Sequence, residues 1–525
     1  MKKRYVGIFF TIIFVFGILL SKLYFISSQT YSQAITALIG SRTKTVTVTN
    51  NRGTIYDRNL EPITNVKAVT KAVIDPMLIK DSSAVLNAVS QENRQDIIQK
   101  LSYETPFCIE LTSDIEKTDG VYLFKAYKRY YDKYPAIHTI GYIDENGVAQ
   151  TGLELAFDNI LKTNTQLCVS FYVDAARRAI SGIEYETMGS FEEIKKGVVT
   201  TLNNKIQQIC DEAADLYIKS GAIVIIDTKT GEILALSSRP AFSPLQLSQV
   251  DSFSGAFINR CFSAFNVGSA FKIIDTAVYL ENGGLWDSKL FCNGSITVGN
   301  NVISCQKTTG HGNISLDTAF SDSCNVFFIK LALELGKDKI LQSAMDFGLG
   351  DKTVLYEGLI SKAGNLPSLK NLSAKAALAN FSIGQGELLA TPLQIASIIQ
   401  TVCNDGIRFE PSLIKGFVDE KGQFSAEPQK EGKRIISKNT SKTIQQLMIN
   451  TVEYGSGARA KPDSGGAGVK TATAQTGNPE NLNGWIAGFF PAESPKYAVA
   501  VLVEKAVSGA RSAGPVFKYI ADKIA

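Results

Sequence analysis

The octapeptide Phe265-Asn-Val-Gly-Ser-Ala-Phe-Lys272 contains the side chains that decide how this 525-residue chain is interpreted. Ser269 and Lys272 stand three residues apart, so a helix places both on one face. A serine attacks an amide only when a base removes its proton, and a lysine serves as that base when burial lowers its pKa. The spacing alone is a weak signal, because Ser304 and Lys307 satisfy it too.

Two further motifs follow the octapeptide in a fixed order. Ser323-Cys-Asn325 falls within residues 316–333, whose pattern predicts a helix, and Lys470-Thr-Ala-Thr473 falls on a predicted strand, Val469–Gln475. The order Ser-x-x-Lys, Ser-x-Asn, Lys-Thr resembles that of penicillin-binding proteins and serine β-lactamases. The octapeptide itself is similar to the family's Tyr/Phe-x-x-Gly-Ser-x-Phe-Lys block.

The resemblance extends over nearly the whole chain and is specific to class B penicillin-binding proteins. Three segments resemble blocks of the family's N-terminal pedestal domain, and three more resemble blocks of its transpeptidase domain. The first three are Arg52–Asn59, His138–Tyr142 and Gly152–Glu154, and the others are Gly221–Ala235, Phe381–Gly386 and Thr391–Gln394. No glycosyltransferase module precedes these blocks in the sequence, which favours class B over the bifunctional class A.

The resemblance implies a peptidoglycan D,D-transpeptidase that works through a serine acyl-enzyme and is inhibited by β-lactams. Ser269 would attack the D-Ala–D-Ala carbonyl of a stem peptide, and Lys272 would take its proton. Ser323 and Asn325 would relay protons and orient the peptide. No cofactor is required for this chemistry.

The resemblance also assigns substrate binding to the predicted strand near the C-terminus. Lys470 and Thr471 would bind the substrate carboxylate, and the backbone N–H groups of Ser269 and Thr473 would stabilise the oxyanion. The family normally has Lys-Thr-Gly here, whereas this chain has Ala472. A methyl group at this position is expected to narrow the substrate groove or tilt the strand, which puts the efficiency and the β-lactam affinity in doubt.

Two other functions use similar motifs and stay open at this point. One is a hydrolase, either a D,D-carboxypeptidase or a β-lactamase-type enzyme, although such proteins generally lack the pedestal and its Arg52–Asn59 block. The other is a non-catalytic β-lactam sensor or scaffold. Labelling with a fluorescent penicillin separates this last class from the two enzymes.

A cluster of potential metal ligands lies between the first two motifs. Cys292, Cys305, His311 and Cys324 fall within 33 residues, and three thiolates with one imidazole make a complete shell for structural zinc. Some class B penicillin-binding proteins carry a metal at a similar place, as the resemblance implies. A Cys292–Cys305 disulfide and free buried thiols are the alternatives. Free buried thiols are expected for the five scattered cysteines, Cys108, Cys168, Cys210, Cys261 and Cys403.

The N-terminus is sharply biased in composition. Three basic residues, 2–4, precede an apolar run that extends over residues 5–26, about the length that spans a bilayer. The basic residues favour a cytoplasmic tail at 1–4 and an extracytoplasmic catalytic domain, in a single-pass protein of the bacterial cytoplasmic membrane. A cleaved signal peptide would be shorter and end in small residues, and a buried core helix would show an amphipathic stripe. The resemblance implies a membrane-embedded glycosyltransferase as partner.

The remaining pattern predicts an α+β fold in two domains. Residues 27–219 mix short strands and helices and are assigned to the pedestal domain, and residues 220–525 to the transpeptidase domain. In the latter, strands from both ends are expected to form one antiparallel sheet, with a largely helical subdomain, residues 265–448, inserted between them. The net charge of +4 is too small and too scattered to indicate nucleic-acid binding.

Overall fold

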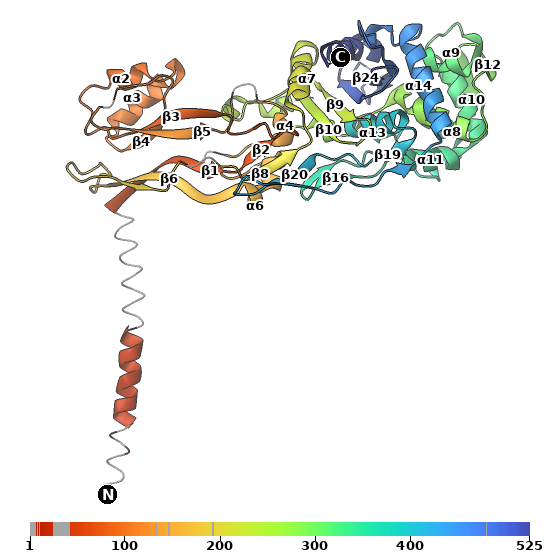
Figure 1. The fold of residues 1–525 in the computed structure, drawn as a ribbon. Coiled ribbons are helices and arrows are strands. Elements are labelled where there is room, and N and C mark those ends of the chain that lie inside the picture. Colours follow the sequence, from red (N-terminus) through yellow and green to blue (C-terminus); the bar gives the residue numbers. More distant parts are fainter. Residues whose placement is uncertain are drawn as a thin grey trace. The chain divides into compact units, whose positions relative to one another are not determined.

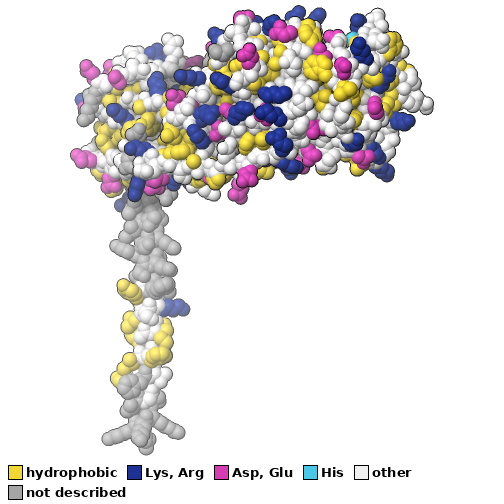
Figure 2. Space-filling model, turned by 45° about the vertical axis from the view of Figure 1, so that its right-hand side comes forward, with side chains coloured by type: hydrophobic (Ala, Val, Ile, Leu, Met, Phe, Trp, Pro, Cys, Tyr) yellow, Lys and Arg dark blue, Asp and Glu magenta, His cyan; other side chains and the backbone are white. Residues whose placement is uncertain are grey.

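The computed structural model describes residues 7, 9, 11–24, 42–116, 118–131, 134–144, 147–191, 194–478 and 480–524. The predicted cytoplasmic tail, residues 1–4, and part of the predicted anchor, residues 5, 6, 8, 10, 25 and 26, lie outside this set. Residues 11–24 are helical and carry exposed apolar side chains, which Figure 2 shows along this helix. Among the residues described, no helix has both the length and the apolar character needed to span a bilayer.

The contacts within the chain divide it into two compact units. Unit 1 comprises Met1–Arg52, Asn65–Arg129 and Thr163–Glu193, and unit 2 comprises Gly53–Thr64, Tyr130–Lys162 and Ile194–Ala525. Three segments before residue 220 therefore belong to the same unit as the C-terminal half. This division is not the single boundary at 219/220 that the sequence predicts. The assignment of the pedestal and transpeptidase domains itself stays a prediction.

Unit 1 contains two small sheets and two apolar clusters, one of which includes residues of both sheets. Val46, Val48 and Val169 are buried along the first sheet, whereas Ala72, Ile74 and Val85 are buried in a cluster that includes the second sheet and its helices. The first sheet has the order β1-β6-β7 and the second β4-β3-β5. The elements are β1 Thr43–Arg52, β3 Lys67–Ile74, α2 Ser83–Asn87, α3 Arg94–Ser102, β4 Phe107–Glu110, β5 Val121–Lys128, β6 Lys162–Tyr172 and β7 Glu186–Met188.

The main sheet of unit 2 is built from both ends of its long C-terminal segment. Its order is β10-β9-β25-β24-β23, and all its pairings are antiparallel. The strands are β9 Gly221–Asp227, β10 Ile233–Arg239, β23 Gly468–Gln475, β24 Leu482–Phe490 and β25 Tyr497–Val503. The expected sheet is therefore confirmed, and β23, which carries the Lys-Thr motif, lies at its edge.

Both faces of this sheet are covered, because its strands are apolar on both sides. Along β9, Ile223 and Ile225 contact one cluster while Val224 and Ile226 contact another, as the period of two requires. Helices α7 (Asn204–Tyr217) and α15 (Gly514–Ile524) cover the first side, and α13 (Pro392–Cys403) covers the second (Figure 1). A sheet buried on both faces is a rigid support for a site at its edge.

The inserted segment is helical but also contains several short hairpins. Besides α13, its α-helices are α8 Lys272–Glu281, α9 Leu316–Ser321, α10 Asn325–Leu335, α11 Lys337–Asp346, α12 Lys375–Ser382 and α14 Lys438–Glu453. Its strands are β11 Phe265–Asn266, β12 Lys289–Cys292, β13 Ser295–Val298, β14 Asn301–Ser304, β15 Gly312–Ser315, β16 Thr353–Tyr356, β17 Leu359–Ser361, β18 Leu389–Ala390, β19 Ile407–Arg408, β20 Ile414–Val418, β21 Phe424–Ala426 and β22 Lys433–Arg434. The predicted largely helical character of residues 265–448 is therefore only partly right.

A second sheet of unit 2 joins segments that are distant in the sequence. It has the order β2-β8-β20-β21, in which β2 is Thr54–Tyr56 and β8 is Gly197–Thr200. Short helices α4 (Ile137–Ile140), α5 (Gly152–Ala156) and α6 (Asp158–Leu161) belong to the same unit. This pairing ties two of the segments before residue 220, Gly53–Thr64 and the start of Ile194–Ala525, to the rest of unit 2.

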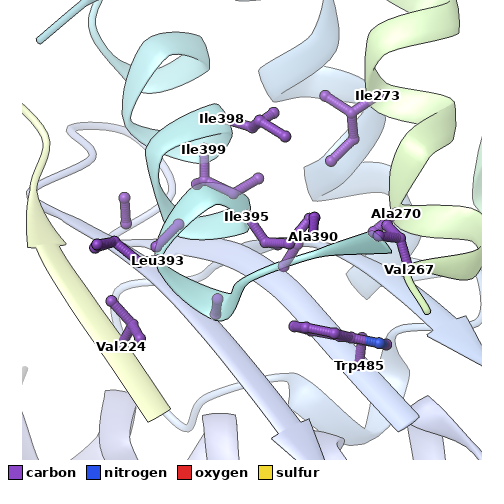
Figure 3. Packing of buried hydrophobic residues seen from close by; sticks show 14 of the residues in the cluster. Val224, Val267, Ala270, Ile273, Ala390, Leu393, Ile395, Ile398, Ile399 and Trp485 are labelled. Carbon is purple, nitrogen blue, oxygen red and sulfur yellow. The ribbon is translucent and has the colours of Figure 1, made fainter. Parts of the chain in front are cut away.

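Helix α13 connects the sheet to the segment that carries the octapeptide. Figure 3 shows its apolar side chains between Val224 and Trp485 of the sheet and the residues from Val267 to Ile273. The indole N–H of Trp485 also donates a hydrogen bond of 2.8 Å to the backbone oxygen of Asn266. The start of α8 is therefore held against the sheet by apolar packing and by a directed hydrogen bond.

Candidate active site

Ser269 lies on a short 3-10 helix, η5 (Gly268–Phe271), which leads directly into α8, and its side chain is only 4% exposed. Gly268 before it has a φ of +64°, and its N–H donates to the backbone oxygen of Gly384 at 2.8 Å. A Cβ on Gly268 would lie 3.1 Å from the Thr473 carbonyl oxygen. Only glycine adopts this positive φ and fits this close to Thr473 without strain. Gly268 therefore allows the turn that places Ser269 beside the edge strand β23.

Lys272 is fully buried and is held by the Ser-x-Asn motif. Its Nζ donates to the backbone oxygen of Ser323 at 2.8 Å, to the Asn325 Oδ1 at 2.9 Å and to the Ser323 Oγ at 3.2 Å. A neutral amine has two N–H donors and one lone pair. The two oxygens that only accept would use both donors, which leaves the lone pair for a serine hydroxyl.

Burial lowers the pKa of Lys272 from 10.5 to about 8, and Cys324, Cys305 and Asp275 partly oppose this shift. The Nζ also lies 5.3 Å from the centre of the Phe328 ring. At neutral pH a much larger share of this lysine is uncharged than of an exposed one. Lys272 can therefore act as a base near neutral pH, as serine activation requires.

The Ser-x-Asn motif interrupts a helix, which the sequence pattern did not predict. The expected helix over residues 316–333 is wrong at its centre, since α9 ends at Ser321 and α10 begins at Asn325. Ser323 adopts a φ of +57°, and Cys324 caps α10 by accepting the N–H of Phe327 at its sulfur. Periodicity does not reveal this break, because the residues on both sides are apolar at helical spacing.

The Lys-Thr motif lies on β23, with one of its two edges paired to β24. Lys470 is fully buried, and burial together with the charge of Lys272 lowers its pKa well below 10.5. The Thr473 hydroxyl accepts a hydrogen bond of 3.1 Å from the N–H of Gly509. The hydroxyl of Thr471 lies 2.7 Å from that of Ser456. Two buried lysines therefore lie close enough for the charge of one to lower the pKa of the other, and an anion is the partner that would offset this repulsion.

Ala472 lies in a strand whose pairing is regular. The register of β23 with β24 runs without a break from Gly468 to Gln475, where Ala472 pairs with Trp485. Ala472 is 2% exposed and belongs to the apolar cluster on the face of the sheet that α13 covers. The pairing of the strand is regular at this position, and the expected narrowing of the groove or tilt of the strand, with its effect on β-lactam affinity, stays a prediction.

Two residues that sequence reasoning did not identify lie close to this machinery. Ser456 contacts Thr471, and its only sequence signal is its position between two glycines after α14. Asp275, one turn after Lys272, is fully buried, and neither of its carboxylate oxygens has a hydrogen-bond partner among the residues described. The sequence signal for Asp275 is an acidic residue that directly follows the apolar pair Ile273 and Ile274.

The predicted metal ligands come together in unit 2. The ligand atoms of Cys292, Cys305, His311 and Cys324 all lie within 4.8 Å of one another. The His311 Nδ1 is 3.5 Å from the Cys292 sulfur and 3.6 Å from the Cys305 sulfur, and the Cys305 and Cys324 sulfurs are 3.7 Å apart. All eight cysteines lie among the described residues and are free thiols. The disulfide alternative is therefore wrong in this structure.

The chain belongs to the penicillin-binding protein transpeptidase family, because the family model of the penicillin-binding protein transpeptidase domain matches residues 221–522, more than half of its length. It is a serine-type transpeptidase of class B, as its relatives indicate. Stage V sporulation protein D of Bacillus subtilis (strain 168) is 30% identical over 489 residues, covering 86% of this chain and 74% of that protein. The peptidoglycan D,D-transpeptidase PbpA of Mycolicibacterium smegmatis is 28% identical over 387 residues, covering 68% and 75%.

A solved structure supports the same assignment at the level of the fold. Penicillin-binding protein A from M. tuberculosis, in an imipenem acyl-enzyme complex, is 25% identical to this chain and has a TM-score of 0.63. The match covers 77% of this chain and 93% of that one. The expected β-lactamase/transpeptidase-like α+β fold is therefore confirmed for the sheet and its helical insertion.

Proposed function

We propose that this protein cross-links peptidoglycan stem peptides through an acyl-enzyme on Ser269 and that β-lactams inhibit it by acylating the same serine. The observation that carries the proposal is the buried amine of Lys272, held by Ser323 and Asn325 with its pKa lowered to about 8. The sequence associates Lys272 with Ser323 and Asn325 only through the order of their motifs, whereas the fold places them within hydrogen-bond distance. A buried lysine beside a serine is the arrangement that activates a hydroxyl without a histidine.

The proposed reaction has two steps that balance. In the first, the Ser269 oxygen forms a bond to the carbonyl carbon of the penultimate D-Ala, Lys272 takes the hydroxyl proton, and the terminal D-Ala leaves with a proton. In the second, the amine of another stem peptide attacks the ester, and the serine oxygen recovers its proton. Lys470 and Thr471 would hold the terminal carboxylate, while the N–H groups of Ser269 and Thr473 would stabilise the oxyanion.

Mass spectrometry of the penicillin-treated protein tests this proposal. The adduct is expected on the peptide that contains Ser269, and Ser269→Ala should abolish it. An adduct on Ser323, or no adduct on folded wild-type protein, would contradict the assignment.

We further propose that residues 5–26 anchor the protein in the bacterial cytoplasmic membrane, with the catalytic domain outside. The support is the apolar run that follows basic residues 2–4, together with the exposed apolar side chains of residues 11–24. Residues 27–219 would then form the pedestal domain, and a membrane-embedded glycosyltransferase would be the partner. Protease added to intact protoplasts should degrade everything after about residue 30, whereas protection of the C-terminal half would contradict this topology.

A structural zinc ion bound by Cys292, Cys305, His311 and Cys324 is a separate proposal. With Zn–S near 2.3 Å and Zn–N near 2.0 Å, a tetrahedral shell has S···S edges of about 3.8 Å and S···N edges of about 3.5 Å. The observed separations of 3.7, 3.5 and 3.6 Å fit three edges of that shell, and the other ligand pairs lie within 4.8 Å. The Cys324 thiol also lowers the pKa of Cys305 by its hydrogen bond, which favours a thiolate.

Zinc would act on catalysis indirectly, by fixing the backbone next to two of its ligands. Cys324 stands between Ser323 and Asn325, and the Asn325 side chain donates to the backbone oxygen of Ser304, next to Cys305, at 3.1 Å. That bond orients the amide so that its oxygen faces Lys272. A closed shell of four protein ligands leaves no position for a reacting water.

Elemental analysis of protein purified without a histidine tag tests this proposal. One zinc per chain is expected, and His311→Ala and Cys305→Ser should lower zinc content and thermal stability together. Cys403→Ala, which removes a buried thiol outside the cluster, should leave the zinc content unchanged. Less than about 0.2 zinc per wild-type chain would contradict the proposal.

A further inference from the structure

Ser456 contacts both the edge strand β23 and the end of helix α9, and the proposed reaction gives it no role. It follows α14, and its hydroxyl lies 2.7 Å from that of Thr471 on the edge strand. Its hydroxyl and its backbone N–H also donate to the same acceptor, the carbonyl oxygen of Ser321 at the end of α9, at 3.0 and 3.1 Å. One serine therefore links the strand of the Lys-Thr motif to the helix that ends just before Ser323.

The glycines on both sides of Ser456 allow its backbone to approach both α9 and β23 closely. A Cβ on Gly455 would lie 2.7 Å from the Ser321 carbonyl oxygen, and a Cβ on Gly457 would lie 2.5 Å from the Val469 side chain. Side chains at these positions would push the turn away from α9 or from β23. The close approach of the backbone is therefore what sets the serine within hydrogen-bond distance of Thr471.

The direction of the hydrogen bond between the Ser456 and Thr471 hydroxyls determines whether Thr471 can donate to a substrate or only accept from it. If Ser456 donates to the Ser321 oxygen, then Thr471 must donate to Ser456, and only its lone pairs remain for a substrate. If Ser456 donates to Thr471 instead, then the Thr471 proton is free for an acceptor. The Ser321 oxygen keeps its bond from the Ser456 N–H in both arrangements, so the change costs little.

We propose that Ser456 is a positioning residue that turns the Thr471 hydroxyl into a donor for the carboxylate of the substrate. The proposal rests on the proposed function, in which Lys470 and Thr471 hold that carboxylate. A bound carboxylate accepts hydrogen bonds but donates none, so it selects the arrangement in which Ser456 donates to Thr471.

The test compares a penicillin that carries its free carboxylate with the methyl ester of the same penicillin. The second-order rate constant for acylation of Ser269 is measured by mass spectrometry for wild type, Ser456→Ala and Ser456→Thr. For the free acid, Ser456→Ala should lower the rate constant about fivefold, the factor expected for losing the neutral hydrogen bond that orients the Thr471 hydroxyl toward the carboxylate. For the ester, the rate constant should change by less than about twofold, and Ser456→Thr should restore the rate with the acid.

A double-mutant cycle shows whether Ser456 acts through Thr471. In a Thr471→Ala background, Ser456→Ala should cost nothing further, because the hydroxyl that it orients is absent. Ser437→Ala, which removes the N-cap hydroxyl of the same helix α14, is the control for loss of stability alone. It should leave acylation unchanged.

Each outcome has one meaning. Equal loss with acid and ester would show general damage to the site, and additive effects in the cycle would show that Ser456 acts independently of Thr471. Either result would overturn the inference. Wild-type protein that is not acylated at all would instead refute the proposed function.

Discussion

Replacement of Ala472 by glycine restores the residue that the family normally has in its Lys-Thr-Gly motif, yet we expect it to weaken the protein. The methyl group is 2% exposed and packs in the apolar cluster below the sheet. Its removal costs about 0.8 kcal/mol of apolar burial. The added backbone freedom of a glycine within a strand costs about another 0.5–1 kcal/mol. The free energy of unfolding should therefore fall by about 1.5 kcal/mol, which corresponds to a drop of about 3 °C in Tm for a domain of this size.

Acylation should respond differently from stability. Because the methyl group lies in the cluster and β23 keeps its register, Ala472→Gly should change the acylation rate constant by less than about threefold. Stability is measured by urea unfolding, and acylation by fluorescent penicillin in stopped flow. Ala500→Gly, at a fully buried site on β25, is the matched control and should lose similar stability. A variant that keeps wild-type stability and is acylated more than about tenfold faster would refute this reasoning and show that the methyl group obstructs the substrate.

Three other substitutions test the buried groups on the helix of the nucleophile. Burial raises the pKa of Asp275 well above 3.8, so the unfolded chain loses a proton that the fold retains, and stability falls as pH rises above about 4. Asp275→Asn should therefore stabilise the protein by about 1–3 kcal/mol at pH 7 and not at pH 3 in urea unfolding; equal gains at both values would contradict this. Gly268→Ala should lose about 1–3 kcal/mol and most acylation, because its φ is +64° and its Cβ would meet Thr473, whereas Gly283→Ala, with φ +84° and open space, should keep acylation. Lys272→Met should lower the acylation rate by at least about a thousandfold, because it removes the base. It should not lower the stability, because a pKa lowered from 10.5 to about 8 means that the charge of Lys272 costs the folded protein about 3 kcal/mol below pH 8. The stability of the wild-type protein should accordingly rise between pH 8 and pH 10. A large loss of stability in Lys272→Met would contradict that account.

The central sheet could be predicted from the sequence because its signal is local. The strands that begin with Gly221 and Tyr497 are continuous apolar runs bounded by turn residues, the pattern of a strand buried on both faces. The order of the motifs then identified Ser269, Lys272 and Lys470, since these residue types carry the chemistry by themselves. The ligand cluster at Cys305 was predicted for the same reason.

The missed features depend on contacts that are distant in the sequence or on special backbone angles. The break at Ser323 needs a positive φ in a residue that is not glycine, which no periodicity reveals. The pairing of Thr54–Tyr56 with Gly197–Thr200 joins short segments about 140 residues apart, and neither has a strong strand pattern. Ser456 is an ordinary turn serine in the sequence, and only its approach to Thr471 in space gives it a role.

The position of β25 in the middle of the main sheet has a consequence for how the chain folds. A chain is synthesised from its N-terminus, and β9 must wait until about 270 further residues have been made before Tyr497 can pair with Asp227. Pairing over such a distance is intrinsically slow and leaves strand edges exposed in the meantime. Termination just before Tyr497 would therefore remove β25, the strand that connects both halves of the sheet. We expect such products to be degraded as unfolded chains, although every residue assigned to catalysis precedes the break.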